Sequence, residues 1–203
     1  MMIDRLEGNS ELKTSVRLML GGRRMTHSVL LVGEEGLGTG FAARCVAADY
    51  LYPNGGAPAE ALLRGECCRA VAKAGKRDSG QIETGIVREA ISVTGMGSGG
   101  RYLVGQVTAM RSEIFNTSLS AEGRAVLLYH VERMNEESAN AVEGHGGAAR
   151  GRAFSVDGGF AGGRSAHHPE PLHQLCSGSR FPHRLRPLLH RTGGGQQGCR
   201  PVQ

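Results

Sequence analysis

The sequence lacks two features of exported and membrane-bound proteins. No apolar run is long enough to span a bilayer, and the first residues, Met1 to Glu7, are polar rather than a secretory leader. The five cysteines stand at irregular spacing with one adjacent pair, which is not the pattern of a secreted disulfide framework. We therefore expect a soluble cytoplasmic protein. Its 203 residues are enough for one α/β domain with a sizeable core.

Net charge is missing from most of the chain. Residues 1–140 carry 16 lysines and arginines against 16 aspartates and glutamates, whereas residues 141–203 carry eight arginines and three acids. The net charge of +5 therefore belongs entirely to the second part. That part has no Lys, Ile, Tyr, Asn or Met, but it holds six of the eight histidines and five of the seven prolines. The basic balance consequently says nothing about the partners of the first part.

A strand, a glycine-rich loop and a helix are predicted in the first fifty residues. The stretch from Ser10 to Leu20 has apolar residues at helical spacing and is ended by glycines. His27 to Val32 has the pattern of a strand, and it is followed by the loop Gly33-Glu34-Glu35-Gly36-Leu37-Gly38-Thr39-Gly40 and a helix from Phe41 to Leu51. Strand, glycine loop and helix in this order are the context that a phosphate-binding P-loop requires.

The loop lacks the side chains that give a P-loop its chemistry. Against the pattern G-x-x-x-x-G-K-[ST], Gly33 and Gly38 fit, but Thr39 stands in the lysine position and Gly40 in the Ser/Thr position. The lysine would place a positive charge on the β- and γ-phosphates, and the hydroxyl would hold Mg²⁺. What remains is a cradle of backbone N–H groups that includes Gly36. We therefore expect a structural turn that at most binds an anion, and no ATP hydrolysis.

A second strand and helix are predicted from Arg124 to Ala141. Ala125 to Tyr129 is a continuous apolar run of the length of a buried strand. Asn135 is suited to cap the following helix, and the two glutamates after it suit the positive end of the helix dipole. Between the strand and the helix stands a single carboxylate, Glu132. In a P-loop ATPase this crossing carries the acidic metal-holding residues, so Glu132 is interpreted as a vestigial acidic position.

The sequence of this second region, VLLYHVERMNEESANA, closely resembles that of the delta-prime subunit of the bacterial DNA polymerase III clamp loader, an AAA+ protein. The stretches GRRMTHSVLLVGEEGLG and YLVGQVTAMRSEIFNTSLSAEGRAVLLYHVERM are similar to the same family. The resemblance implies an α/β fold, with a partial P-loop NTPase (AAA+) core and a parallel sheet over residues 1–140. Members with a degenerate loop are familiar in that family.

The resemblance also implies a function. The complete protein would be a non-catalytic subunit of the DNA polymerase holoenzyme, a nucleotidyltransferase complex, without ATPase or polymerase activity of its own. It would sit in a pentameric ring with the ATP-hydrolysing tau/gamma subunits and the delta subunit. There it would offer an arginine to a neighbour's ATP and help load the sliding clamp onto primed DNA.

The middle of the chain is predicted to alternate between helices and strands. We expect a helix from Pro58 to Ala74, a polar linker from Lys73 to Gly80 and a strand from Glu89 to Thr94. A flexible glycine turn over residues 95–100, a short strand at Tyr102 to Val104 and an amphipathic helix ending at Phe115 follow.

Cysteine positions do not support a zinc site. Family members often carry a small zinc module near the position of Cys67 and Cys68. A tetrahedral site needs about four ligands at C-x₂₋₄-C spacing, and an adjacent pair with the distant Cys45 does not supply them. We expect buried thiols, and neither zinc nor ATP as a cofactor.

Periodicity stops after Ala141, and glycine, arginine, proline and histidine become enriched. Read one base later, residues 141–150 can encode LLKVMEEPPE, residues 151–162 GAPFLLTVDSPE and residues 165–174 LPTIRSRCTS. These resemble, in order, the family's helix-turn, its next core strand and its Ser-Arg-Cys motif. We therefore expect residues 141–203 to be a disordered, frameshifted tail.

This interpretation of the tail removes several family features. The arginine of the Ser-Arg-Cys motif, the helical lid and the C-terminal collar domain would be absent. The sheet would lose the strand after the Glu-Glu-Pro-Pro turn, and the exposed edge would favour aggregation.

Two other functions stay open at this point. The chain could be an active P-loop ATPase of another AAA+ type, although Thr39, Gly40 and the lone Glu132 argue against it. It could also bind nucleic acid non-specifically through the basic stretch from Arg180 to Arg191. The six histidines of the tail could also be read as a metal-binding cluster, but translation of out-of-frame codons explains them better. They are His145, His167, His168, His173, His183 and His190.

Overall fold

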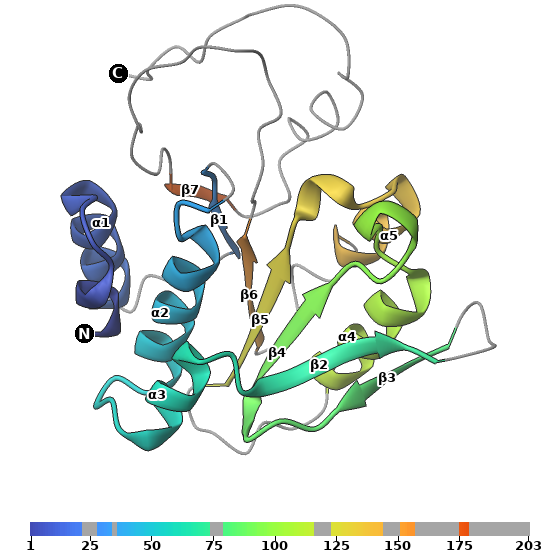
Figure 1. The fold of residues 1–203 in the computed structure, drawn as a ribbon, viewed down its shortest axis with the longest axis horizontal. Helices are drawn as coiled ribbons and strands as arrows, with labels where there is room; N and C mark the ends of the chain where they lie inside the picture. Colours follow the sequence, from blue (N-terminus) through green and yellow to red (C-terminus); the bar gives the residue numbers. More distant parts are fainter. Residues whose placement is uncertain are drawn as a thin grey trace, which may run out of the picture.

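The computed structural model describes residues 1–21, 28–33, 36–73, 79–115, 123–143, 151–156 and 175–178. It is an α/β structure with a mixed, mostly parallel sheet (Figure 1). The strands are β1 Ser28–Leu31, β2 Cys67–Ala72, β3 Gly80–Glu83, β4 Val87–Thr94, β5 Arg124–Tyr129, β6 Gly151–Val156 and β7 Leu175–Gly178. The helices are α1 Ser10–Gly21, α2 Thr39–Leu51, α3 Ala57–Leu63, α4 Val104–Phe115 and α5 Glu136–Glu143, with short 3₁₀ turns η1 Met2–Arg5, η2 Ser98–Gly100 and η3 Val131–Arg133.

The strand order is β3-β2-β4-β5-β6-β1-β7. Neighbouring strands from β2 to β1 run parallel, whereas β3 and β7 pair antiparallel with β2 and β1 at the two edges. The expected parallel sheet is therefore confirmed for the central strands, and the edges make it mixed. Parallel strands end at the same side of the sheet, so β1 and β5, with β6 between them, deliver their carboxyl ends to one edge.

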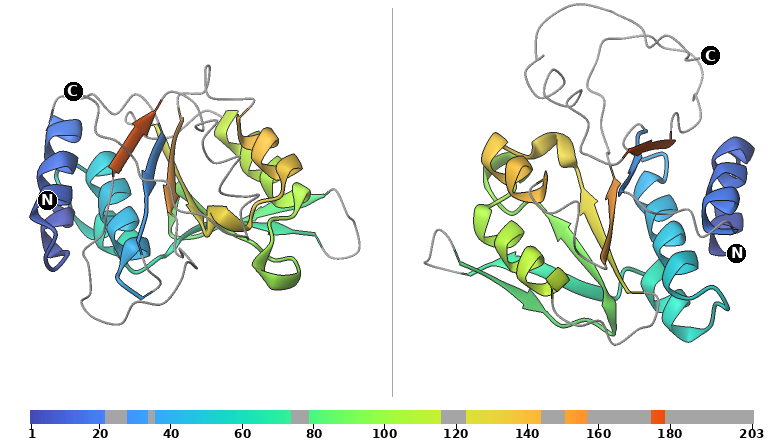
Figure 2. Two further views of the ribbon diagram at one scale, coloured as in Figure 1. Left: turned by 90° about the horizontal axis from the view of Figure 1, so that it is seen from above. Right: turned by 180° about the vertical axis from the view of Figure 1, so that it is seen from behind.

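Alternating residues of the central strands divide the core into two clusters, one on each face of the sheet. Ala125 and Leu127 of β5 pack with α2 and α3, whereas Val126 and Leu128 pack with α4. Figure 2 shows α1 and α2 on one side of the sheet and α4 and α5 on the other. Four consecutive residues of β5 are buried, because helices cover both faces of the sheet there. This explains why the apolar run in β5 is continuous and does not alternate with polar residues.

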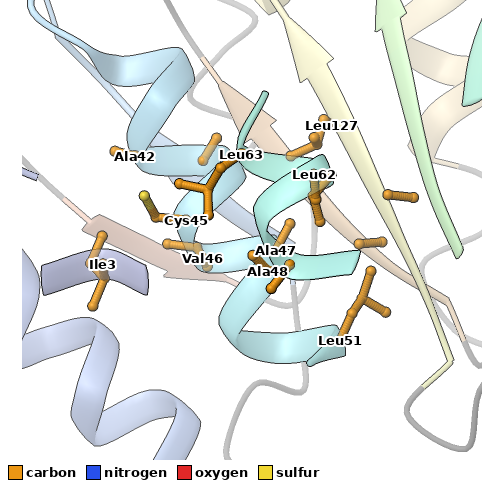
Figure 3. Packing of buried hydrophobic residues seen from close by; sticks show 14 of the residues in the cluster. Ile3, Ala42, Cys45, Val46, Ala47, Ala48, Leu51, Leu62, Leu63 and Leu127 are labelled. Carbon is orange, nitrogen blue, oxygen red and sulfur yellow. The ribbon is translucent and has the colours of Figure 1, made fainter. Parts of the chain in front are cut away.

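Helix α2 is the centre of the first cluster. Its small side chains let it lie close to α3 and β5, as Figure 3 shows. Asp49, only 7% exposed, faces the N-terminus of the chain. Its carboxylate accepts hydrogen bonds from the backbone N–H groups of Met2 (2.6 Å) and Ile3 (2.9 Å). These bonds fasten η1 over α2 and satisfy the buried charge.

The predicted helix from Pro58 to Ala74 is wrong in its second half. Helix α3 ends at Leu63, because Gly65 takes a left-handed conformation (φ +82°) and the N–H of Glu66 bonds back to the carbonyl of Ala61. The chain then enters β2, a strand with buried residues on both faces. Apolar residues at these positions serve a strand as well as a helix, so periodicity alone did not separate the two.

Two neighbouring predictions also need correction. The linker expected from Lys73 to Gly80 is followed at once by the edge strand β3, and residues 74–78 lie outside the described part. Tyr102 is not in a strand. Its buried hydroxyl donates to the carbonyls of Val93 (3.2 Å) and Tyr129, and α4 begins at Val104. A tertiary hydrogen bond therefore fixes the segment that was predicted to pair.

The other predicted elements are confirmed to within a few residues. They are α1, β1, α2, β4, α4 and β5. Asn135 caps α5 as expected, since its side-chain oxygen accepts from the N–H of Ser138 at 2.8 Å.

Two segments of the tail that we expected to be disordered form strands, β6 and β7. Strand β6 lies between β5 and β1 and pairs with both, so the sheet does not lose a strand there. Strand β7 covers the edge of β1. A segment between two open strand edges gains hydrogen bonds on both sides, which compensates for weak sequence periodicity. The other tail residues after 143 lie outside the described part, and the frameshift itself stays a prediction.

No helix among the described residues has the length and apolar character needed to cross a membrane.

Candidate functional site

The glycine-rich loop connects the carboxyl end of β1 to the amino end of α2. Gly36 and Gly38 have left-handed backbones, with φ of +91° and +83°, which favours glycine at both positions. Gly38 is the N-cap of α2, and its carbonyl accepts from the N–H of Ala42 at 2.8 Å. Gly33 follows β1, and residues 34 and 35 lie outside the described part. The loop therefore has the strand-to-helix position that the sequence predicts.

Thr39, in the lysine position of the motif, is the first residue of α2. It is 5% exposed, and among the described residues its hydroxyl has no hydrogen-bond partner. A buried hydroxyl cannot replace an ammonium group that reaches β- and γ-phosphates. The loop consequently has no charge at this position for a nucleotide.

Gly40, in the Ser/Thr position, lies against the aromatic ring of Tyr129, the last residue of β5. A Cβ atom on Gly40 would be 3.3 Å from Cε1 of Tyr129 and 3.7 Å from Nη1 of Arg44. The first of these distances is tighter than ordinary van der Waals contact. The position that holds magnesium in a P-loop enzyme is therefore lined by a phenol ring and a guanidinium group.

Arg44 lies beside Tyr129, and each is held by further contacts. Arg44 donates from Nε to the carbonyl of Leu63 at 2.8 Å, and its guanidinium carbon lies 5.9 Å from the centroid of the Phe41 ring. Burial raises the pKa of the Tyr129 hydroxyl, and the Arg44 guanidinium beside it offsets part of this shift. The backbone carbonyl of Tyr129 accepts from the hydroxyl of Tyr102.

Sequence analysis did not identify Tyr129 or Arg44 as site residues. One signal could have found Tyr129. It ends a buried parallel strand, and the ends of parallel strands lie at the same edge as the loop after β1.

Glu132, the predicted vestigial acidic position, lies in η3, where its carboxylate pairs with Arg133 and lies close to His130. Its Oε1 atom is 3.4 Å from Nδ1 of His130 and 3.4 Å from Nε of Arg133. Its Oε2 atom is buried and has no hydrogen-bond partner among the described residues. The structure thus places Glu132 one turn beyond the end of β5. At the strand end itself, Tyr129 rather than a carboxylate faces the loop.

The three described cysteines are buried free thiols. Cys67 and Cys68 belong to the two different core clusters, and burial raises the pKa of Cys45 to about 12. In the described ranges, no three His, Cys, Asp or Glu side chains are grouped so that they could hold a metal ion. The tail histidines and the stretch from Arg180 to Arg191 lie outside those ranges.

The loop residues do not fit a magnesium–nucleotide complex. The ammonium and the hydroxyl ligand are replaced, and the space beside Gly40 is lined by Tyr129 and Arg44. No protein-family model matches the chain, and no curated protein matches it either. The function is therefore inferred from the site and from the sequence resemblance.

Proposed function

We propose that this chain is a non-catalytic, delta-prime-like AAA+ subunit of the bacterial DNA polymerase III clamp loader, acting in the loading of the sliding clamp onto primed DNA. The observation that carries the proposal is a glycine loop in the P-loop position whose catalytic groups are replaced at Thr39, Gly40 and Tyr129. The clamp-loader assignment itself comes from the sequence resemblance over residues 1–140.

The arrangement of the sheet supports a P-loop type of core. β1, which leads into the loop, and β5, which leads to Glu132, are parallel and are separated only by β6. Neighbouring strands are about 4.8 Å apart, so the two strand ends lie about 10 Å from each other at one edge. Ligands of open α/β sheets bind at such an edge.

The replaced residues support a non-catalytic role. Phosphoryl transfer depends on positioned positive charge and on a magnesium ion held by a hydroxyl and a carboxylate. Thr39 brings no charge, Gly40 brings no hydroxyl, and a tyrosine ends β5. An active ATPase is therefore the weaker alternative. In the clamp-loader ring, ATP hydrolysis would belong to the tau/gamma subunits.

The tail makes this particular chain defective under the proposal. The family's Ser-Arg-Cys arginine is not present in residues 141–203 as written, and it returns when the sequence is read one base later. Resequencing the gene across codons 138 to 145 tests the frame directly. A shift that restores LLK..EEPPE and Ser-Arg-Cys is the expected result, and stop codons soon after in the other frame would contradict it.

The clamp-loader role is tested by reconstitution. The chain as written and a frame-restored version are each mixed with tau/gamma and delta subunits, and ring assembly is followed by size-exclusion chromatography. We expect the frame-restored protein to enter the ring and to support clamp loading on primed DNA, and neither version to hydrolyse ATP alone. Failure of the frame-restored protein to assemble would overturn the clamp-loader assignment, whereas ATP hydrolysis by the chain alone would favour the active ATPase.

A further inference from the structure

We propose that the side chains of Tyr129 and Arg44 form an internal plug beside the glycine-rich loop. The plug fills the position that a magnesium ion would take and so prevents the binding of a magnesium–nucleotide. The plug is a second barrier, separate from the missing lysine and hydroxyl. The inference rests on the P-loop assignment made above, but it does not depend on the clamp-loader role.

The first step is steric. In P-loop enzymes the metal lies between the Ser/Thr hydroxyl of the loop and a carboxylate that follows a neighbouring strand. Magnesium holds its ligands at about 2.1 Å and keeps several water molecules, so it needs open space between these two groups. Here a Cβ atom on Gly40 would lie 3.3 Å from the Tyr129 ring. A side chain restored at position 40 would therefore begin against the Tyr129 ring instead of in open space.

The second step is electrostatic. Nη1 of Arg44 would lie 3.7 Å from the same Cβ atom, so a fixed positive charge already stands beside the metal position. The Leu63 carbonyl and the Phe41 ring hold this guanidinium in place. A divalent cation would be repelled by it, because two positive charges at short distance in a partly buried site are only weakly screened by water.

The third step is that the ring is fixed by the sheet. Tyr129 pairs in register with Thr94 of β4 and Val156 of β6, and its carbonyl accepts from the Tyr102 hydroxyl. Its side chain packs against the first core cluster, which contains α2. The plug therefore also joins β5 to the first turn of α2.

The plug is tested with full-length variants that restore the P-loop side chains. Thr39→Lys/Gly40→Ser is compared with Thr39→Lys/Gly40→Ser/Tyr129→Asp, and Mg-ATP binding is measured by isothermal titration calorimetry. Thr39→Lys/Gly40→Ser/Tyr50→Asp is the matched control. It also replaces a tyrosine by aspartate, but at Tyr50 of α2, and it keeps Tyr129. We expect the variant that lacks Tyr129 to bind Mg-ATP at least about tenfold more tightly than the other two variants do. Equal binding by the double and the Tyr129→Asp variants would overturn the plug.

A second measurement keeps the test decisive if Tyr129→Asp fails to fold by circular dichroism. Tyr129→Phe and Tyr129→Leu are made in the natural sequence, and amide hydrogen exchange is measured at Ala42 and Ala43 in the first turns of α2. Phenylalanine keeps the ring over Gly40, so exchange should stay within about threefold of the natural chain, whereas leucine should raise it about tenfold or more. Unchanged exchange in both variants would show that the ring does not hold the helix. Neither measurement uses clamp-loader subunits, so their failure is distinguishable from failure of the proposed function.

Discussion

The two faces of the sheet are closed by different means. On the first face, α2 presents alanines and a valine that are completely buried, and small side chains let the helix approach β5 and β6. On the second face, α4 approaches through glycine. A Cβ atom on Gly80 of β3 would overlap the carbonyl of Gly105, and one on Gly105 would overlap the carbonyl of Ser79. Packing on the first face therefore depends on the volume of the side chains, and packing on the second face depends on close contact between backbones.

Polar groups sharpen the contrast. Gln106 on α4 is fully buried, and its amide group donates to the carbonyls of Ala70 within β2 (3.0 Å) and Thr94 at the end of β4 (2.9 Å). Its side-chain oxygen accepts from the N–H groups of Met96 and Leu103. A single side chain therefore hydrogen-bonds to four backbone groups, in β2, at the end of β4 and in the segment before α4. Asp49 on the first face serves η1 instead of the sheet.

The largest effect is expected from Gly80→Ala on the second face. The new methyl group collides with the α4 backbone, which cannot move as a flexible side chain would, so the free energy of unfolding should fall by about 4 kcal/mol. Urea denaturation measures this. Gly21→Ala, where a Cβ atom meets nothing within 4 Å, is the control and should change little. A small effect of Gly80→Ala would mean that β3 and α4 can separate at low cost.

Leu62→Ala tests the first face by volume. Leu62 is completely buried between α2 and the sheet, and the cavity left by alanine should lower the free energy of unfolding by about 3 kcal/mol. The matched control is Leu18→Ala on α1, since Leu18 is 70% exposed. Equal losses for the two leucines in urea denaturation would contradict the assigned core.

Gln106→Leu tests how much the hydrogen bonds of a buried side chain on the second face contribute to stability, apart from the space that the side chain fills. Leucine fills most of the same space but leaves buried carbonyl and N–H groups without partners, which should lower the free energy of unfolding by about 2 kcal/mol. The exposed Gln81 on β3 provides the control variant Gln81→Leu. A neutral Gln106→Leu would indicate that water replaces the amide contacts.

The effect that is smallest near neutral pH concerns the Cys45 thiol on the first face, because it develops only under alkaline conditions. Burial raises the pKa of the Cys45 thiol from 9.0 to about 12, so the folded state keeps its proton where the unfolded state loses it. This contribution to stability is complete below pH 9 and is lost as the pH rises toward 12. Cys45→Ala should therefore lose less stability between pH 9 and 12 in urea denaturation. An identical pH dependence of the two proteins would show that the thiol is not desolvated.

Local sequence information predicted the central elements well. Asn135, β5 and α2 follow from side-chain caps and apolar runs, which act over a few residues. The end of α3 was missed, although the glycine at position 65 is a local C-cap signal, because the apolar run continues directly into β2. Strand β6 was also missed, since its partners, β1 and β5, lie far from it in the sequence.

The candidate site was predicted in part. Gly33, Gly36 and Gly38 lie between β1 and α2, and Thr39 and Gly40 are the first two residues of α2, as the motif indicates. Glu132 lies near the same strand end but pairs locally, and Tyr129 takes the place beside the loop. The sequence alone could not pair Tyr129 with Gly40, because that contact depends on strand order.

The sequence by itself determined which chemistry is missing. The absence of a lysine at position 39 and of a hydroxyl at position 40 is a matter of covalent structure, and no fold can supply those groups. Only the tertiary structure decided what stands in their place. Parallel pairing brings the end of β5 to the start of α2, and the ring of Tyr129 then occupies the space beside Gly40 because side chains in a packed core fill the space that the backbone leaves.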